Sequence, residues 1–265
     1  MTMDAEPGKS DLADSASGFH LEALRKLAAI HTPRSFEDVR AAVARPPGGS
    51  GDAAGRAKGE SDLEEAVIRE YSRSQAAAGA SAIADARRAL ANAGVGGSWG
   101  HAVAELLRGH PLVPAGREEL FARGLSAGLE GDLPAAVHLL LPQMESSLRR
   151  LLELRGFPVQ RRWGDGWADR PLNDFLTDSA AEPILGKNLA WELRSLLVEH
   201  GGPNLRNRVC HGQATVGDCR GPHAEYLVWV SLWFLVRFRE PTAGAEEGRV
   251  EHTTDSSVPV LPDRG

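Results

Sequence analysis

The clearest repeating pattern of apolar residues lies near the middle of the chain and predicts a long helix. Between Asp132 and about Leu154, apolar side chains recur at steps of three and four residues, which would place them on one helix face. Asp132 is a suitable N-cap for this helix, and Gly156 ends the pattern. Pro142 lies inside the pattern and cannot donate a backbone hydrogen bond, so we expect a bend there.

Shorter patterns of the same kind predict that most of the remaining chain is helical. Glycine and proline residues separate the expected helices, which cover residues 62–77, 80–93, 99–107 and 189–199. A last helix is expected from Pro222 to about Arg239, and its apolar run is typical of a helix buried in a core. That run is shorter than the roughly 20 residues that cross a bilayer. The expected fold class is an all-α helical bundle without a membrane span.

Two kinds of segment depart from the helical pattern. Residues 159–169 hold two short runs around a Gly-Asp-Gly turn, which predicts one small hairpin. Residues 1–60 combine short helical patterns with a stretch rich in proline and glycine, so we expect a mostly disordered lead-in with short helices. The helical domain is expected over residues 61–240, with its core in residues 115–240, and a disordered tail over residues 241–265.

Composition and charge narrow the functional classes. The net charge of -6 and the pI near 5.9 argue against an extended basic face that binds nucleic acid, and leave a local basic site open. The two cysteines do not form a disulfide framework, and the first residues lack the basic and apolar regions of a signal peptide. We therefore expect a cytoplasmic protein.

The segment from Asn204 to Gly212 carries the strongest functional signal in the sequence. A Gly-Gly-Pro break precedes it, so a new helix is expected to begin here, with the Asn204 side chain accepting a backbone N–H as its N-cap. Arg206 would lie in the first turn, where free N–H groups and the helix dipole favour an anion such as phosphate. Arginine followed by histidine at similar spacing also occurs at residues 25–31 and 194–200, but without an adjacent amide and a helix start.

These residue types fit RNA cleavage without a metal. That reaction needs a base for the ribose 2′-hydroxyl, a cation for the crowded phosphorane and an acid for the departing 5′ oxygen. His211 can act as base or acid, and Arg206 can bind two phosphate oxygens while staying charged. Asn207 does not titrate, so we assign it to orienting its neighbours or the substrate. No cofactor or metal ion is needed.

The motif also resembles a known superfamily. Arg206-Asn207-x-x-x-His211 resembles the signature of the all-helical HEPN domains, and the run from Asn204 to Gly212 resembles a family within or near them, domain of unknown function 4209. A second segment, from Gly128 to Arg149, resembles that family's pattern upstream of the motif. Together the two segments span roughly residues 115–212. After Gly212 the chain departs from the family, because small and polar residues stand where apolar ones are expected.

The resemblance implies a HEPN-like helical bundle that forms a homodimer through its motif helices. In active HEPN members the arginine and histidine perform metal-independent endoribonuclease chemistry, so Arg206 and His211 would be catalytic here. RNA would then be the partner of a local site. HEPN domains are common in toxin–antitoxin and anti-phage defence systems, in which an antitoxin would be a further partner.

Helical geometry favours a dimer independently of the resemblance. On an ideal helix, Arg206 and His211 differ by about 140° around the axis and by roughly 7.5 Å along it. One copy would therefore bring the two side chains together poorly. A two-fold axis beside the motif helix would bring His211 of one copy towards Arg206 of the other.

Two residues of the long central helix are candidates for a supporting role. Glu145 and Arg149 are four residues apart, which places them on one helix face in the favourable acid-first order. They would form either a solvated ion pair of about 0.3–0.5 kcal/mol or part of the site. In the second case Glu145 would hold His211 in one tautomer or pair with Arg206.

Two alternatives remain open. In the first, a zinc ion would be bound by the side chains of Cys210, His211, Cys219 and His223. Their spacing is not one that zinc sites usually have, and we expect Cys210 to be an ordinary buried cysteine. The chain would otherwise be a noncatalytic helical protein-interaction domain. In that case Arg206 would donate to core acceptors and His211 would be buried, while the tryptophans Trp191, Trp229 and Trp233 would fill a helix interface.

Overall fold

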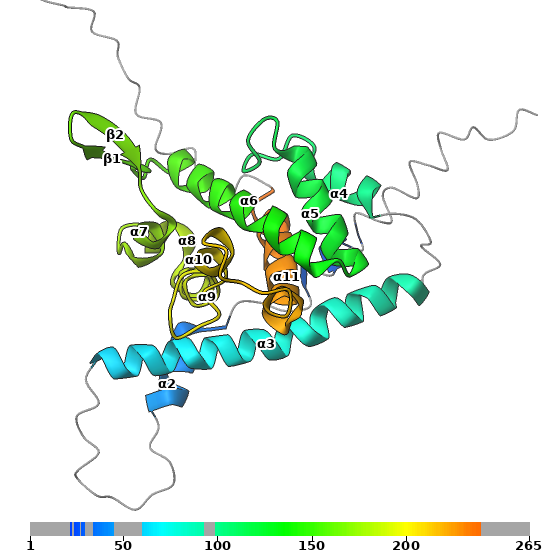
Figure 1. Ribbon diagram of the computed structural model, residues 1–265, viewed down its shortest axis with the longest axis horizontal. Coiled ribbons are helices and arrows are strands. Elements are labelled where there is room, and N and C mark those ends of the chain that lie inside the picture. Colours follow the sequence, from blue (N-terminus) through cyan, green and yellow to red (C-terminus); the bar gives the residue numbers. More distant parts are fainter. Residues whose placement is uncertain are drawn as a thin grey trace, which may run out of the picture.

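The computed structural model describes residues 22, 24–26, 28–29, 34–44, 60–92 and 99–239 of the chain (Figure 1). These residues are mostly helical, with one two-stranded hairpin, which confirms the all-α class. The tail expected over residues 241–265 and most of the lead-in expected over residues 1–60 lie outside the described residues. Within the described ranges, no helix is both long and apolar enough to cross a lipid bilayer.

Helix α6, Leu133–Leu154, is the long helix that the apolar pattern predicts. The Asp132 carboxylate accepts a backbone N–H of its first turn at 3.3 Å, which confirms the expected N-cap. The helix continues through Pro142. Its buried face packs on α5, Glu118–Glu130, and on α11, Pro222–Arg237.

Helix α11 lies at the centre of the bundle (Figure 1). It contacts α5 and α6, and also α3, Glu60–Asn92, and α4, Gly100–Leu107. Nearly all of its side chains from Tyr226 to Leu235 are buried. The apolar segment is therefore the core helix that the sequence predicts, since a helix that is apolar all round needs partners on every side.

Helix α3 is continuous where the sequence predicts two helices, over residues 62–77 and 80–93. The prediction of a break is wrong, because Gly79 does not end the helix but makes room for a neighbouring helix. A Cβ atom at Gly79 would clash with the backbone oxygen of Pro222 and would lie 2.8 Å from the backbone nitrogen of Tyr226. The glycine therefore lets the backbones of α3 and α11 approach closely, at a propensity cost of about 1 kcal/mol.

Part of the expected lead-in packs against the bundle. Helix α2, Phe36–Ala44, begins after Ser35, whose hydroxyl accepts a backbone N–H of the first turn at 3.3 Å. Its buried face lies on α3 and near α9, Lys187–Leu197. The rings of Phe36 and Trp191 have centroids 4.6 Å apart. The ordered structure therefore extends into the residues before α3.

A buried carboxylate links this region to the core. Glu192 of α9 is 1% exposed, and it accepts hydrogen bonds from the Tyr226 hydroxyl and, at 3.3 Å, from the backbone N–H of Arg34. The Gln75 amide donates to the backbone oxygen of Glu192 at 2.8 Å. Burial raises the pKa of the Glu192 carboxyl to about 7, because its hydrogen bonds only partly replace lost hydration.

The hairpin expected over residues 159–169 is present. Strand β1, Gln160–Trp163, pairs antiparallel with β2, Gly166–Asp169, and the hairpin projects away from the helices (Figure 1). Two short helices, α7, Leu172–Thr177, and α8, Glu182–Leu185, then lead to α9. The chain thus returns to the bundle directly before the motif.

Candidate functional site

The motif helix α10, Leu205–Cys210, is short and packs against α9. Leu205 is its buried residue, and the rest of the helix is partly or fully exposed. The Gly-Gly-Pro break before it also has a packing role, because a Cβ atom at Gly202 would clash with the carbonyl of Ser195 on α9. This close approach sets the motif directly beside the end of α9.

The structure corrects the expected role of Asn204. This residue stands at the N-cap position of α10, but its side chain does not accept a backbone N–H of the helix. Its backbone is left-handed, with φ 50° and ψ 40°, whereas a side-chain cap normally needs an extended N-cap residue. The Asn204 side-chain oxygen instead accepts from the Asn207 amide at 2.8 Å. Asparagine is among the residues that tolerate this conformation best.

The Asn207 side chain forms hydrogen bonds to three different parts of the motif and its surroundings. Its amide nitrogen donates to Asn204 and, at 3.4 Å, to the backbone oxygen of Val198 at the end of α9. Its amide oxygen accepts from Nη1 of Arg206 at 3.2 Å. Asn207 therefore links the helix start, the preceding helix and the arginine through its side chain.

Glu145 of α6 binds Arg206 through two hydrogen bonds. Nε of Arg206 donates to Oε2 of Glu145 at 3.0 Å, and Nη2 donates to Oε1 at 3.4 Å. The two side chains are 19% and 25% exposed, so water screens this pair less than a surface pair. Of the two roles open to Glu145 inside the site, the structure brings it to Arg206. The two segments that carry the HEPN resemblance meet at this ion pair.

Arg149 lies beside the same carboxylate, near an oxygen that also accepts from Arg206. Its Nη2 lies 3.7 Å from Oε1 of Glu145, and its guanidinium also donates to the backbone oxygens of Val159 and Arg170, each at 3.1 Å. The Arg149 guanidinium carbon lies 4.9 Å from the ring centroid of Phe175. Glu145 and Arg149 are thus partly buried and held by further contacts, so they do not form the solvated ion pair that was one of the two expectations.

His211 lies just beyond the end of α10 and is exposed. Its backbone N–H still donates to the oxygen of Asn207 at 3.0 Å, so the helical ladder reaches it. Its imidazole makes no hydrogen bond to another side chain that the structure describes, and the Arg206 guanidinium faces Glu145 of α6. Within one copy, no hydrogen bond among the described residues joins the imidazole to the Arg206 guanidinium.

The residues of the zinc alternative lie in different environments. Cys210 is exposed, which corrects the expectation that it is buried, while Cys219 is buried. The ring of His223 contacts the backbone oxygen of Ser72 on α3 at 2.9 Å, and burial lowers its pKa. Across the described ranges, no group of three or more histidine, cysteine, aspartate or glutamate side chains is placed to hold a metal ion.

The tryptophans of the interaction-domain alternative are divided between two packing regions. Trp229 is buried in α11, and its ring centroid lies 6.2 Å from that of Trp233. Trp191 packs on Phe36, at the side of the bundle that carries α2. This alternative also expects a buried His211, whereas the structure exposes that side chain.

A second polar cluster fixes the chain just after the motif, and the sequence reasoning missed it. The Asp218 carboxylate accepts from the backbone N–H of Thr215 at 2.8 Å, from the Thr215 hydroxyl at 2.7 Å and from Arg208 at 2.7 Å. These bonds hold the pKa of Asp218 down at about 2, the backbone N–H of Thr215 having the largest effect. A threonine followed three residues later by an acidic residue has the spacing of a capping box, and this pattern could have indicated the cluster from the sequence. The cluster joins α10 to the loop that follows it.

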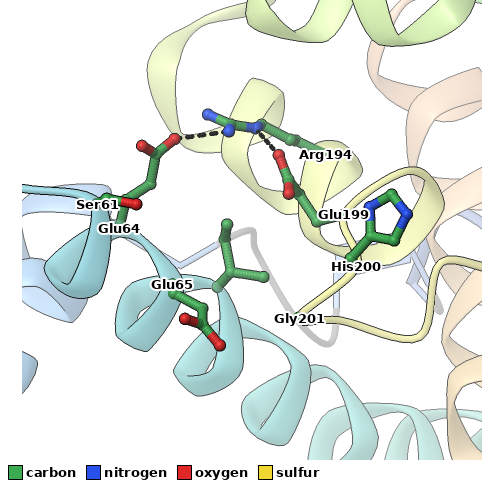
Figure 2. A pocket seen from close by; sticks show the side chains of 8 residues that line it. Ser61, Glu64, Glu65, Arg194, Glu199, His200 and Gly201 are labelled. Carbon is green, nitrogen blue, oxygen red and sulfur yellow. Dashed lines mark hydrogen bonds and ion pairs between the residues drawn. The ribbon is translucent and has the colours of Figure 1, made fainter.

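A cavity of about 390 Å³ lies beside the loop that precedes the motif (Figure 2). Its lining includes Arg194 and His200, one of the other arginine and histidine pairs in the sequence. In Figure 2, Arg194 lies between Glu64, at 2.6 Å, and Glu199, and is held by both carboxylates. Three glutamates line this cavity, including Glu65, so it is less suited to a phosphate than the Arg206 cluster.

The chain was compared with protein-family models, curated proteins and solved structures, and it matches none of them.

Proposed function

We propose that the protein is a metal-independent endoribonuclease of the HEPN type whose active site forms between two copies of the chain. The ion pair between Glu145 and Arg206 is the observation that supports this most. It joins the two sequence segments that resemble domain of unknown function 4209, a family within or near the HEPN domains, and it fixes the guanidinium of Arg206 beside the Asn207 amide. The same helix ends at the exposed His211, so the residues that the chemistry needs share one surface element.

Arg206 retains the capacity to bind phosphate although it is already paired. A guanidinium has five N–H donors, and the Arg206 contacts to Glu145 and Asn207 use one donor on each of its three nitrogens. Each terminal nitrogen therefore keeps one N–H for a phosphate oxygen. Arg149 approaches the same carboxylate at 3.7 Å, so the cluster of Glu145, Arg149 and Arg206 carries two positive charges against one negative.

His211 of the other copy supplies the proton chemistry. Its imidazole takes the proton of the ribose 2′-hydroxyl, the 2′ oxygen attacks phosphorus, and Arg206 balances the charge of the phosphorane. The imidazolium then returns the proton to the departing 5′ oxygen. The products are a 2′,3′-cyclic phosphate and a 5′-hydroxyl. Asn207 and Glu145 act as positioning residues because they contact Arg206.

Cleavage of labelled single-stranded RNA in the presence of EDTA tests this function. The wild-type chain should cleave without a divalent metal, and Arg206→Ala and His211→Ala should each lower the rate by about a hundredfold or more. Arg150→Ala and His200→Ala are matched controls, because both side chains are exposed and lie outside the motif. They should cleave like the wild type. A folded dimer that leaves the RNA intact, or variants of Arg206 and His211 that cleave normally, would contradict the proposal.

A further inference from the structure

The β1–β2 hairpin carries the two most exposed large apolar side chains of the described residues. Trp163 is 68% exposed and Trp167 is 70% exposed. Every residue of β1 is exposed, as are all residues of β2 except the half-buried Ala168, so these rings do not cover a core of their own. An indole ring that stays exposed to water adds no hydrophobic stabilisation to the fold. Exposed aromatic groups of this size commonly mark a binding surface.

Each face of the hairpin presents one indole beside one guanidinium. Arg162 pairs directly with Trp167 across the strands, and directly paired residues of antiparallel strands share a face. Arg161 and Trp163 are two residues apart on β1, so they share the opposite face. The guanidinium carbon of Arg161 lies 5.3 Å from the ring centroid of Trp163. Each face of the hairpin thus carries one aromatic and one cationic group, and Asp169 shares the face of Arg162 and Trp167.

The charged groups of the hairpin bear on the kind of ligand. The whole chain has a net charge of -6, and the exposed strand β1 contains two arginines and no acidic residue. The acidic residues of the hairpin are Asp165 in the turn and Asp169 of β2, and Asp169 accepts a hydrogen bond from the Gln160 amide at 3.0 Å. Arg161 has one ion-pair partner, Asp174 at 3.3 Å, and Arg162 forms no ion pair with any residue that the structure describes. Aromatic rings on which bases stack, flanked by arginines for the phosphates, are the features that bind single-stranded nucleic acid.

The base of the hairpin is attached to the motif cluster. Arg149 donates to the backbone oxygen of Val159, just before β1, and to that of Arg170, just after β2. The same arginine lies 3.7 Å from the Glu145 carboxylate, which binds Arg206. One carboxylate therefore lies between the base of the hairpin and the arginine of the motif.

We infer that the hairpin binds single-stranded RNA, with bases stacked on Trp163 and Trp167 and phosphates contacting Arg161 and Arg162. The inference rests on the proposed function, since it names the substrate form that would reach the motif. A flexible single strand can follow both faces of the narrow hairpin, so each indole can hold a base. A duplex keeps its bases stacked on each other and offers none to these rings.

Binding is measured by fluorescence anisotropy with a short labelled single-stranded RNA in EDTA. All proteins carry His211→Ala, so that cleavage does not interfere. Adding Trp163→Ala and Trp167→Ala together should weaken binding by at least about tenfold, because base stacking on an aromatic ring contributes that much. The pair Trp163→Phe and Trp167→Phe should retain most of the affinity. Leu120→Ala is the control, because Leu120 is also an exposed apolar residue, on α5.

The outcomes separate this inference from the proposed function. Unchanged RNA affinity in the double alanine variant overturns the hairpin site, even if the wild type cleaves RNA. Equal affinity for single-stranded and fully double-stranded RNA also overturns it. Loss of dimerisation with unchanged RNA affinity would make the hairpin a protein interface instead. Weaker binding in the alanine variant supports the inference, even if the wild type proves unable to cleave.

Discussion

Glu145 and Arg206 lie 61 residues apart in the sequence and form a two-point ion pair between α6 and α10. Arg149 approaches the same carboxylate, so one anion holds two guanidinium groups. Through Arg149 the cluster also reaches the backbone on both sides of the hairpin. The motif is therefore positioned by contacts with α6 and not by its own short helix alone.

Replacing Glu145 by glutamine tests the contribution of this carboxylate to stability. The substitution keeps the size of the side chain but removes its charge, so two guanidinium groups lose their common partner. We expect the free energy of unfolding in urea to fall by about 1–2 kcal/mol, because the hydrogen bonds are charge-assisted and partly buried. The rate of RNA cleavage should fall as well, because Arg206 loses its anchor.

Glu153→Gln is the matched control for this substitution. Glu153 lies on the same helix and pairs with Arg150 at 3.5 Å, but both side chains are far more exposed. Its removal should change the free energy of unfolding by no more than about 0.5 kcal/mol. Equal losses in the two variants would show that the Glu145 cluster is no stronger than a surface pair.

Alanine at Gly79 should destabilise the protein although alanine is the better helix former. The added methyl group would meet the backbone of α11 at Pro222 and Tyr226, and backbone atoms cannot move aside as a flexible side chain does. We expect a loss of about 2–3 kcal/mol in the free energy of unfolding. Gly201→Ala is the comparison, since its nearest neighbours lie at 3.5 Å and 3.6 Å. A neutral or stabilising Gly79→Ala would disprove the close crossing of α3 and α11.

The buried Glu192 should make stability depend on pH. Burial raises the pKa of its carboxyl from 4.5 to about 7, so the folded state keeps this proton over a range in which the unfolded chain has released it. Stability is then lost as the pH rises from about 4.5 to about 7, and Glu192 adds no further change above that range. The loss amounts to roughly 3 kcal/mol.

Glu192→Gln removes this titration and isolates its effect. The free energy of unfolding in urea is measured for both proteins at a series of pH values. Between about pH 4.5 and 7, the wild type should lose stability relative to the variant. The hydrogen bond from the Tyr226 hydroxyl can persist in the variant, because an amide oxygen also accepts. Two curves that stay parallel across the range would mean that Glu192 keeps an ordinary pKa.

Local patterns in the sequence were enough to predict several elements. Asp132 caps α6, the apolar run from Pro222 forms the core helix, and the Gly-Asp-Gly turn closes the hairpin. Each of these depends on residues that are neighbours in the chain or on one helix face. A glycine in the sequence has two possible meanings, because it can end a helix or let the backbone of another helix approach closely. Only the position of α11 shows which role Gly79 has.

The geometry of the candidate site could be predicted only in part. The sequence identified Glu145 but left its partner open between His211, Arg206 and solvent, since spacing within α6 does not say what packs against it. The left-handed backbone of Asn204 was missed because asparagine suits both an N-cap and this conformation. The exposure of His211 also depends on where the short α10 ends, which residue preferences do not fix.

Complementation between two inactive variants tests the composite site most directly. Arg206→Ala and His211→Ala chains are co-expressed, so that mixed dimers form, and RNA cleavage is measured in EDTA against each variant alone. If Arg206 and His211 act across the dimer, the mixture should recover about a quarter of the wild-type rate, because half of the dimers are mixed and each holds one intact site of two. A mixture that contains mixed dimers and stays as inactive as the separate variants would contradict the composite site.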